Sequence, residues 1–407
     1  MDKHFLTPLF SPESIVVFAG RVDDPASQTA HAQVLHRVLR EQRFAGTLVF
    51  LDIQVSGTLA DLAHTKADLA IIAVPPSEVA SALEIAGRIK CRAALVISSG
   101  IDAIHAAELH KIARRDGIHL LGPNCVGFQR PHLLLNASVV SSLCAPGPLA
   151  LVSQSGALTS SILDWAQKNA VGFSSVVTLG PNTAVDMAQI LDFLANDART
   201  HSIVIYMEGI SNSRKFMSAL RAASNAKPVV ILKAGRKPAG NRAALTHSGT
   251  IVGADDVFDA ALRRAGAVRV RSFVQLFSAA KCLASRYRPV GRRLAIVTNG
   301  GGPGVLAADW ISEIKLQLGC LSAEQVRTLA PQLPPLASLC DLIDVSEDAG
   351  PEHFQIAVET AGKAAQIDGV LVIYSPKIGM DSGAVASALV EINRQIGKPL
   401  LTCFMGA

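Results

Sequence analysis

Short apolar runs alternate with helix-length segments along most of the chain, and this alternation predicts a parallel α/β architecture. The runs are rich in Val, Ile and Leu, which is typical of strands that are buried on both faces. Helices are predicted between them, for example over Glu78–Ile89, Ala103–Arg115 and Ala157–Lys168. The predicted strands of the first group are Ser14–Gly20, Gly46–Asp52, Asp68–Pro75, Ala93–Gly100 and Ile118–Asn124.

Two further groups of strands follow, one after a connector with Pro, Gly and Ser at Ser141–Pro148 and one after a basic connector at Ser285–Arg293. Because each group can form one domain, we expect domains over residues 1–140, 146–287 and 290–407. The strands predicted in the last two are Leu149–Ser153, Ser174–Gly180, Ser202–Gly209, Pro228–Gly235, Ala267–Val270, Leu294–Gly304, Asp368–Pro376 and Pro399–Gly406.

The second and third groups repeat one another. PLALVSQSGAL in one is similar to RLAIVTNGGGP in the other, SIVIYMEG to GVLVIYSP, and PVVILKAGR to PLLTCFMGA. A repeat of this length indicates two copies of one α/β unit. The second copy stops where the first continues with a further loop and helix, so we expect the third domain to be incomplete at its C-terminus.

Composition narrows the class of protein. The chain has 407 residues, of which 49% are hydrophobic and 17% charged, and this balance excludes a disordered protein. No apolar run reaches the roughly 18 residues that a membrane-spanning helix needs, and the N-terminus lacks an export signal. Seven widely spaced cysteines without a CxxC pair are typical of reduced thiols and indicate no metal site. We expect a cytoplasmic protein with no membrane partner.

The net charge of +5 comes from scattered basic residues and short pairs such as Arg114–Arg115. This balance suits a small polyanionic ligand, and the lack of a basic stripe with interleaved aromatic residues predicts no nucleic-acid partner.

The loop between the predicted strand Leu149–Ser153 and the following helix is the first candidate for chemistry. Ser153, Ser155 and Gly156 would sit at the helix N-terminus, where free backbone N–H groups and the helix dipole favour a phosphate. An ordinary helix cap is the simpler interpretation of the serines, since Ser is a preferred N-cap residue.

A second candidate is His247, within the glycine-rich and basic run Ala234–Gly249, which we predict to be irregular. A free imidazole nitrogen there could attack an activated phosphoryl group, although a plain surface histidine is the simpler interpretation. A helix is predicted to resume near Ala254, with Asp255 and Asp256 in its first turn.

A third candidate is Glu208, which follows a predicted buried strand and so lies at the functional edge of the sheet. Its carboxylate could hold one ring nitrogen of His247 and make the other more nucleophilic; a capping or ion-pairing role is the alternative. In the first domain, Val74–Ser77, Ser98–Gly100 and the run Leu121–Phe128 follow strands and would meet at one edge suited to a nucleotide. The first turn, Ala19–Pro25, lacks GxGxxG and contains two acids, which disfavours an NAD-dependent dehydrogenase.

Together these motifs resemble the α-type half of the NDP-forming acyl-CoA synthetases, the superfamily of succinyl-CoA synthetase and ADP-forming acetyl-CoA synthetase. The resemblance rests on LLGPNCVGF, LVSQSGAL, YMEG and THSGTIVGADDVFDAALRRAGAVRV, in that order. It implies a Rossmann-like CoA-binding domain followed by two flavodoxin-like parallel α/β domains. It further implies that His247 is the phosphohistidine, that Glu208 orients it, and that phosphate is held by Ser153, Ser155, Gly156 and Gly249.

The resemblance also implies ligands and partners. CoA or acyl-CoA would contact Gly20, Val74, Pro75, Ser77, Ser98, Gly100, Gly122, Pro123 and Asn124. ADP or ATP and Mg²⁺ would bind to an ATP-grasp β-type subunit or domain, in a homo- or hetero-oligomer. The stretch from SILDWAQ to SALRAAS is most similar to a bacterial subfamily that is fused to ATP-grasp and, often, GNAT acetyltransferase domains.

Two functions are therefore expected from the sequence. In the first, the chain is the α-type part of an acid–CoA ligase for acetate or another short acid, which relays phosphate through His247 to ADP on its partner. In the second, it is a non-catalytic acyl-CoA-sensing region of a GNAT-type protein lysine acetyltransferase, and His247 is a remnant.

Overall fold

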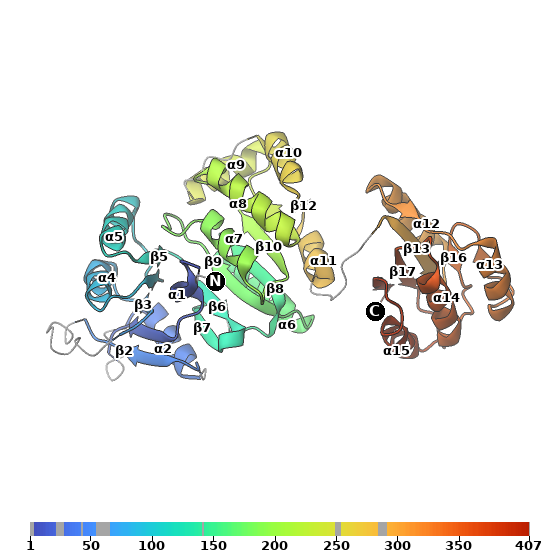
Figure 1. Cartoon of the computed structure of the whole chain (residues 1–407), viewed down its shortest axis with the longest axis horizontal. Coiled ribbons are helices and arrows are strands. Elements are labelled where there is room, and N and C mark those ends of the chain that lie inside the picture. Colours follow the sequence, from blue (N-terminus) through green and yellow to red (C-terminus); the bar gives the residue numbers. More distant parts are fainter. Residues whose placement is uncertain are drawn as a thin grey trace. The chain divides into compact units, whose positions relative to one another are not determined.

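The structure, a computed structural model, describes residues 4–21, 28–41, 44–53, 66–140, 142–248, 254–283 and 291–406. The chain divides into two compact units, Met1–Ser285 and Arg286–Ala407. The first unit contains two mainly parallel sheets and the second contains one, with helices on both faces of each sheet (Figure 1). The predicted α/β class is confirmed. The expected division of the first 287 residues at residue 140 remains a proposal.

The first sheet has five parallel strands in the order β2-β1-β3-β4-β5. Alternate residues of β1 enter different cores: Val17 packs in the core that holds Leu35, and Val16 in the core that holds Leu83. The elements are α1 (Thr7–Phe10), β1 (Ser14–Phe18), α2 (Ala30–Glu41), β2 (Thr47–Phe50), β3 (Leu69–Ile72), η2 (Pro76–Glu78), α4 (Val79–Arg88), β4 (Ala93–Val96), α5 (Ala103–Arg115) and β5 (His119–Leu121).

The second sheet has seven strands in the order β12-β11-β10-β8-β9-β6-β7. Its strands are β6 (Gly127–Arg130), β7 (Leu135–Ser138), β8 (Pro146–Ser153), β9 (Phe173–Thr178), β10 (Ser202–Met207), β11 (Val229–Lys233) and β12 (Val268–Val270), and η3 (Pro131–Leu133) joins the first two. β6 and β7 are antiparallel and were not predicted. Although they precede residue 140, they belong to this sheet, because β6 pairs with β9.

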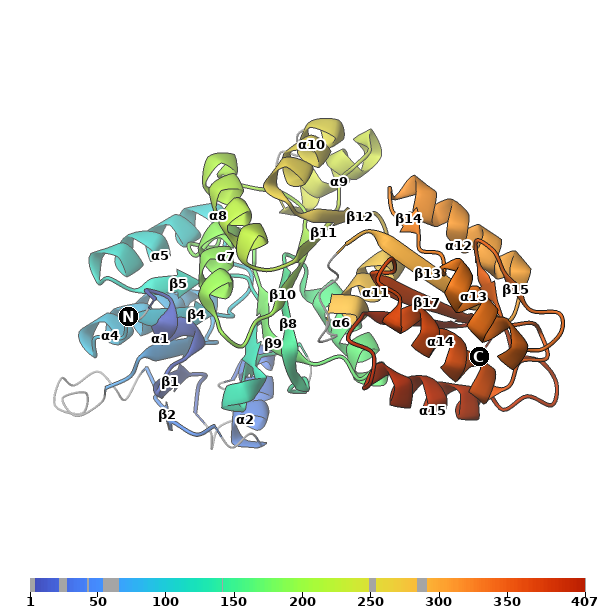
Figure 2. The same cartoon turned by 45° about the vertical axis from the view of Figure 1, so that its right-hand side comes forward.

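Helices cover both faces of the second sheet. α6 (Gly156–Lys168) and α11 (Phe273–Leu283) lie on one face, where the rings of Trp165 and Phe277 stack at 4.3 Å. α7 (Met187–Asn196), α8 (Ser213–Ala226) and α10 (Asp255–Ala265) pack on the other face (Figure 2). These helices leave the carboxyl ends of β8, β10 and β11 side by side at one edge.

The prediction that Ala234–Gly249 is irregular was wrong, because α9 spans Pro238–Ser248. Proline is tolerated at the first position of a helix, where its missing N–H would have no intrahelical partner. Ala239, Ala243 and Ala244 supply helix-forming residues that compensate for the single internal glycine. The helix that was predicted to resume near Ala254 is confirmed as α10, with Asp255 and Asp256 in its first turn.

The third sheet forms the second unit, in the order β15-β16-β13-β17-β18, with β14 paired to β13. Helices α13, α14 and α15 pack on one face of this sheet, and α12 packs on the other. The elements are β13 (Arg293–Thr298), α12 (Gly301–Glu313), β14 (Gln317–Leu318), α13 (Ala323–Leu329), η4 (Ala330–Gln332), β15 (Ser338–Leu339), β16 (Ile343–Asp344), α14 (Pro351–Lys363), β17 (Gly369–Tyr374), α15 (Ser382–Asn393) and β18 (Leu400–Phe404).

Hydrogen bonds confirm the internal repeat. After β8, the Ser153 hydroxyl donates to the Ser155 carbonyl at 2.9 Å and accepts the Ser155 N–H at 3.1 Å. After β13, the Thr298 hydroxyl donates to the Gly300 carbonyl at 3.0 Å and accepts the Gly300 N–H at 3.1 Å. The two strand–loop–helix segments thus share one turn geometry.

Among the described residues, no helix has both the length and the apolar character to cross a membrane.

Candidate functional site

The predicted phosphate loop and Glu208 directly follow two neighbouring strands, β8 and β10, which pair in parallel and end together. Gln154 connects the two loops that follow these strands. Its side-chain oxygen accepts the backbone N–H of Glu208 at 2.6 Å and that of Gly209 at 3.2 Å, and its side-chain nitrogen donates to the Gly209 carbonyl at 3.0 Å. A single amide therefore fixes the start of α6 relative to the end of β10.

The two serines of the loop hold its shape. Ser153 is fully buried, and its hydroxyl is used within the turn. Ser155 is the N-cap of α6, and its hydroxyl accepts the N–H of Leu158 at 3.3 Å. The N–H groups of Gly156 and Ala157 precede the first intrahelical bond, so they are the donors that the helix N-terminus can offer an anion.

Gly156 is required by a close neighbour. A Cβ atom at this position would lie 2.9 Å from Cγ1 and 3.1 Å from Cγ2 of Val126. A side chain at Gly156 would therefore displace the residue that precedes β6. The predicted role of Gly156 in phosphate binding remains a proposal.

Glu208 is buried, with 7% of its surface exposed. Burial, together with the negative charge of Glu208 and a hydrogen bond to it, raises the pKa of Tyr206 to about 12. Lys233, the last residue of β11, donates from Nζ to the Glu208 carbonyl at 2.8 Å. The backbone of Glu208 is thus held at its N–H by Gln154 and at its carbonyl by Lys233. Neither contact was predicted. The sequence contained a signal for each, since Lys233 ends an apolar run and Gln154 is a polar residue between two serines.

His247 lies near the end of α9, the helix that follows β11 along the chain. The described part of His247 is its backbone, and Gly249 lies outside the described residues. The start of this segment is tied to α10 and β12: the guanidinium of Arg236 lies 3.7 Å from the carboxylate of Asp255, and Arg269 forms an ion pair with the same carboxylate. Arg269 approaches Asp259 at 3.4 Å as well.

The residues predicted to contact CoA divide into exposed and buried groups. Ser77 and Gly100 are exposed and Gly20 is partly exposed at the carboxyl edge of the first sheet. The Ser98 hydroxyl donates to the Val74 carbonyl at 2.6 Å, and the Asn124 side chain bonds both backbone groups of Ile101. These side chains therefore join neighbouring loops. Residues 22–27, which contain the two acids of the first turn, lie outside the described residues.

Two of the predicted contact residues are packed between the two sheets of the first unit. Gly122 and Pro123 are buried, and the Gly122 N–H donates to the Thr183 hydroxyl at 3.0 Å. A Cβ atom on Gly180 would meet the Pro123 carbonyl oxygen at 2.5 Å, which explains the glycine there. Pro75 and Asn124 are partly exposed, so the accessible candidates for CoA contact lie at Gly20, Pro75, Ser77, Gly100 and Asn124.

The second unit repeats the geometry of the site with different residues. Asn299 occupies the position of Gln154, donates to the Ser375 carbonyl at 2.9 Å and accepts its N–H at 2.8 Å. Ser375 occupies the position of Glu208 in the aligned strands. The second copy therefore keeps the connecting amide and has no carboxylate at the position that corresponds to Glu208.

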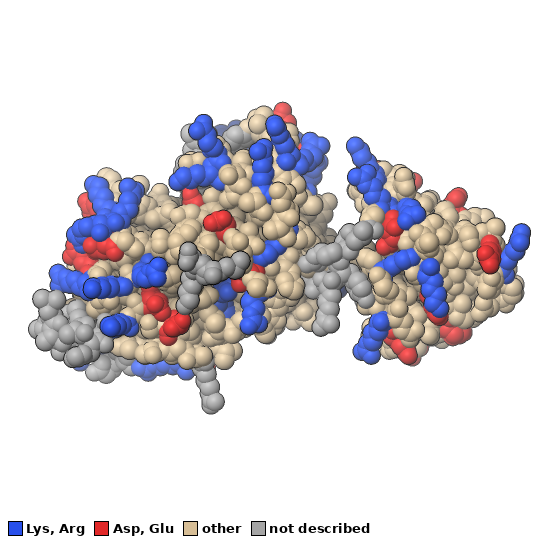
Figure 3. Space-filling view, in the orientation of Figure 1, with Lys and Arg blue, Asp and Glu red and all other residues tan. Residues whose placement is uncertain are grey.

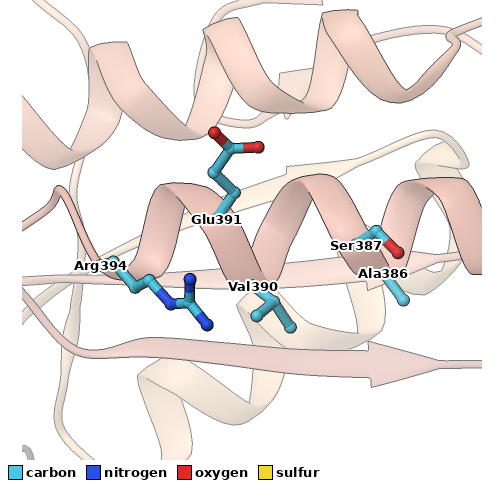
Figure 4. Close-up of a pocket in the computed structure, with 5 residues that line it drawn as sticks. All are labelled: Ala386, Ser387, Val390, Glu391 and Arg394. Carbon is cyan, nitrogen blue, oxygen red and sulfur yellow. The ribbon is translucent and has the colours of Figure 1, made fainter.

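The surface has a further pocket and many charged side chains. A shallow pocket in the second unit is lined by Ala386, Ser387, Val390 and Glu391 of α15 and by Arg394, which directly follows this helix, and Figure 4 shows Val390 and Glu391 on opposite sides of the helix. On the face shown in Figure 3, Lys and Arg are spread among Asp and Glu. Within the described ranges, no group of three or more His, Cys, Asp or Glu side chains could hold a metal ion.

Comparisons with known proteins agree with this arrangement. Residues 146–283 match the family model of the succinyl-CoA ligase like flavodoxin domain, and residues 46–131 match that of a CoA binding domain. The predicted Rossmann-like CoA-binding and flavodoxin-like domains are thereby confirmed. In structure, the chain is similar to a dinucleotide-forming acetyl-coenzyme A synthetase 1 of Ca. Korarchaeum cryptofilum in complex with phosphate and ADP, with a TM-score of 0.91 and 28% identity, over 99% of this chain and 89% of that one.

Two curated relatives define the family. The chain is 37% identical to an ADP-forming acetate–CoA ligase I of Archaeoglobus fulgidus over 83% of its own length, and it spans 49% of that relative's length. It is 32% identical to the α subunit of the ADP-forming acetate–CoA ligase I of Pyrococcus furiosus, over 84% of this chain and 75% of the relative. The chain therefore belongs to the family of ADP-forming acetate–CoA ligases.

Proposed function

We propose that the chain is the α-type part of an ADP-forming ligase that joins acetate or another short acid to CoA, and that His247 carries the phosphoryl group between its two half-reactions. The observation that carries this proposal is the edge where β8, β10 and β11 end. There Gln154 ties the N-terminus of α6 to Glu208, and the next strand leads into the helix that contains His247.

The chemistry can be written in the direction of ATP formation. A phosphate oxygen attacks the thioester carbonyl of acyl-CoA, the C–S bond breaks, and the CoA thiolate leaves, which gives an acyl phosphate. A ring nitrogen of His247 then attacks phosphorus, the bond between phosphorus and the acyl oxygen breaks, and the carboxylate leaves. Phosphohistidine finally transfers its phosphoryl group to ADP and regenerates the imidazole.

The residues of the edge have separate roles in this proposal. The N–H groups of Gly156 and Ala157 and the dipole of α6 stabilise the phosphate charge, since phosphoryl transfer depends mainly on positioning and charge stabilisation. The Glu208 carboxylate accepts a hydrogen bond from the N–H of the other ring nitrogen of His247, which fixes the tautomer and raises the nucleophilicity of the attacking nitrogen. The burial of Glu208 supports this role, because a buried carboxylate keeps a single orientation.

The CoA substrate fits the first sheet. Gly100 has a φ of +83° and nothing within 4 Å of the place where a Cβ would stand, so a ligand can approach its backbone. Together with Gly20, Pro75, Ser77 and Asn124 it forms the accessible part of the predicted CoA edge. We propose that CoA lies there with its thioester toward the phosphate loop.

The partner in this proposal is an ATP-grasp β-type subunit or domain that holds ADP or ATP and Mg²⁺. The existence of a separate α subunit in the Pyrococcus furiosus relative supports a two-part assembly. The curated relatives described above are CoA ligases, and nothing among them favours the acetyltransferase alternative or a GNAT partner. A cytoplasmic location remains an expectation from the sequence.

Labelling with γ-³²P ATP tests the proposal. The chain is incubated with its ATP-grasp partner, and the label on the chain is expected to be stable in base, labile in acid and absent from the His247→Ala variant. Label on another residue, or none with an active partner, would refute the proposal. Binding of acyl-CoA without any phosphorylation would instead favour the sensing function.

A further inference from the structure

Lys233 is a buried cation that the proposed chemistry does not use. It is the last residue of β11, and only 4% of its surface is exposed. Its Nζ donates to the carbonyls of Glu208 at 2.8 Å and of Ala234 at 2.5 Å, and it lies 5.6 Å from the centre of the Phe258 ring. The ammonium group therefore joins the ends of β10 and β11 through two backbone acceptors.

Charged groups surround Lys233 on three elements. Glu208 follows β10, Asp255 begins α10, and Arg269 lies in β12. Burial lowers the pKa of Lys233 to about 8, while Asp255 and Glu208 act in the opposite direction and Arg269 adds to the lowering. Burying a charged ammonium group here costs free energy, because the group loses its hydration. Buried charges that carry such a cost often have a specific role.

The internal repeat shows that the fold itself does not need this charge. Lys233 pairs with Met207, and in the second unit Phe404 pairs with Tyr374 at the same position. The backbone bond next to the pair is the same in both copies: Ala234 N–H donates to the Met207 carbonyl at 2.9 Å, and Met405 N–H donates to the Tyr374 carbonyl at 2.9 Å. An aromatic side chain thus ends the equivalent strand in the copy that lacks a carboxylate at the Glu208 position.

We propose that Lys233 is a positioning residue for the step in which His247 is phosphorylated. By donating to the Glu208 carbonyl, it fixes the backbone that carries the Glu208 carboxylate. By donating to the Ala234 carbonyl, it fixes the first peptide of the segment that leads to His247. This inference rests on the proposed function. With Gln154 on the N–H side and Lys233 on the carbonyl side, the Glu208 backbone has one position, and its carboxylate can hold the imidazole proton in one orientation.

The chain offers a matched control at the other end of the same strand. Lys227 precedes β11, is partly buried and also donates to two backbone carbonyls, those of Leu194 at 2.6 Å and Asp197 at 2.7 Å. Replacing Lys227 with Met removes the same kind of contact at the opposite edge of the sheet. Lys233→Met and Lys227→Met should therefore lose comparable stability, and only the first should affect the phosphohistidine step.

The test measures the rate of His247 phosphorylation by labelled ATP with the ATP-grasp partner present, together with the thermal midpoint, for the wild type, Lys233→Met, Lys233→Arg and Lys227→Met. We expect Lys233→Met to be slower by on the order of 10- to 100-fold, the effect of displacing a catalytic group by about 1 Å. Lys233→Arg should recover part of the rate, and Lys227→Met should keep it.

The pH profile distinguishes positioning by the cation from packing. The wild-type rate should fall as the pH rises above about 8, where Lys233 loses its charge, and Lys233→Arg should not show this fall. The inference is overturned if Lys233→Met phosphorylates like the wild type, or if it and Lys227→Met lose the rate equally. A wild-type protein without label on His247 would refute the proposed function, and this inference with it.

Discussion

The side-chain oxygen of Gln154 accepts the backbone N–H of Glu208 at 2.6 Å, so the residue after β8 holds the residue after β10. Asn299 makes the equivalent contact with Ser375 in the second unit. The same amide contact thus occurs in two copies of one fold, while the residue that it holds differs. The amide contact is therefore a feature of the shared fold, whereas the carboxylate of Glu208 occurs in the first copy alone.

Gln154→Ala should slow phosphorylation of His247 by on the order of 10- to 100-fold, because Glu208 then loses its fixed position. The freed backbone groups should also cost about 1–3 kcal/mol of unfolding free energy. Labelling rates and denaturant titrations measure the two effects. Gln167→Ala, which changes an exposed glutamine on the following helix α6, serves as the control and should change neither. An unchanged labelling rate in Gln154→Ala would contradict the role given to this amide.

Gly156→Ala should raise the KM for phosphate, because the new Cβ would lie 2.9 Å from Cγ1 of Val126 and would push the start of α6 away from that residue. Overpacking of this kind costs about 1–3 kcal/mol. Adding Val126→Ala should restore much of the loss by making room, and a double-mutant cycle of the KM for phosphate and of stability measures the coupling. If the double variant is as impaired as Gly156→Ala alone, the contact with Val126 is not the reason for the glycine.

The ion pair between Arg130 and Asp197 should stabilise the first unit in a pH-dependent way. The two groups meet at 2.8 Å, with 5% and 9% of their side chains exposed. Burial raises the pKa of the Asp197 carboxyl, but the hydrogen bond and charge of Arg130 outweigh it, so the pKa lies below its usual range. The pair therefore contributes fully above the unfolded pKa of about 3.9, and its contribution is lost as the pH falls through the lower folded pKa.

Asp197→Asn should cost about 3–5 kcal/mol at neutral pH, since it leaves a buried guanidinium without its partner. The difference from the wild type should shrink in acid, and urea unfolding at several pH values measures it. Asp164→Asn, which breaks an exposed pair with Lys168, should stay within about 1 kcal/mol. Equal effects of the two variants would refute the contribution assigned to the buried pair.

The acids of the first turn should weaken CoA binding through repulsion of its phosphates. The double variant Asp23→Asn/Asp24→Asn should therefore bind CoA several-fold more tightly than the wild type, by about 1 kcal/mol at low salt, and less so at high salt. Calorimetry with CoA measures the affinity. Glu108→Gln, on the exposed side of α5, should leave it unchanged. An unaltered affinity in the double variant would separate these acids from the CoA site.

The regular elements of the fold could be predicted from the sequence because their patterns are local. The strands buried on both faces, such as β3 and β10, read as continuous apolar runs, and the helices between them followed from length and spacing. β6 and β7 were missed because each is only four residues long, and because the pairing that places them in this sheet joins β6 to β9, a strand far along the chain. α9 was missed because its glycine and basic residues outweighed the start signal of Pro238.

The sequence predicted which edge of the sheet holds the site, but it did not predict the contacts between the residues there. Ser155 and Glu208 follow neighbouring strands, so parallel pairing alone brings them together. Ser153 was expected to face a ligand, whereas its hydroxyl is buried in the turn. The roles of Gln154 and Lys233 depend on which backbone groups they reach, and sequence spacing does not determine that.

Mapping of the phosphorylated residue by mass spectrometry tests the central proposal most directly. The chain and its ATP-grasp partner are incubated with ATP, digested at neutral or basic pH and compared with the His247→Asn variant. We expect a phosphoryl group on the ring of His247 that disappears when ADP is added and is absent from the variant. A phosphoryl group on any other residue, or an active complex in which His247→Asn turns over like the wild type, would contradict it.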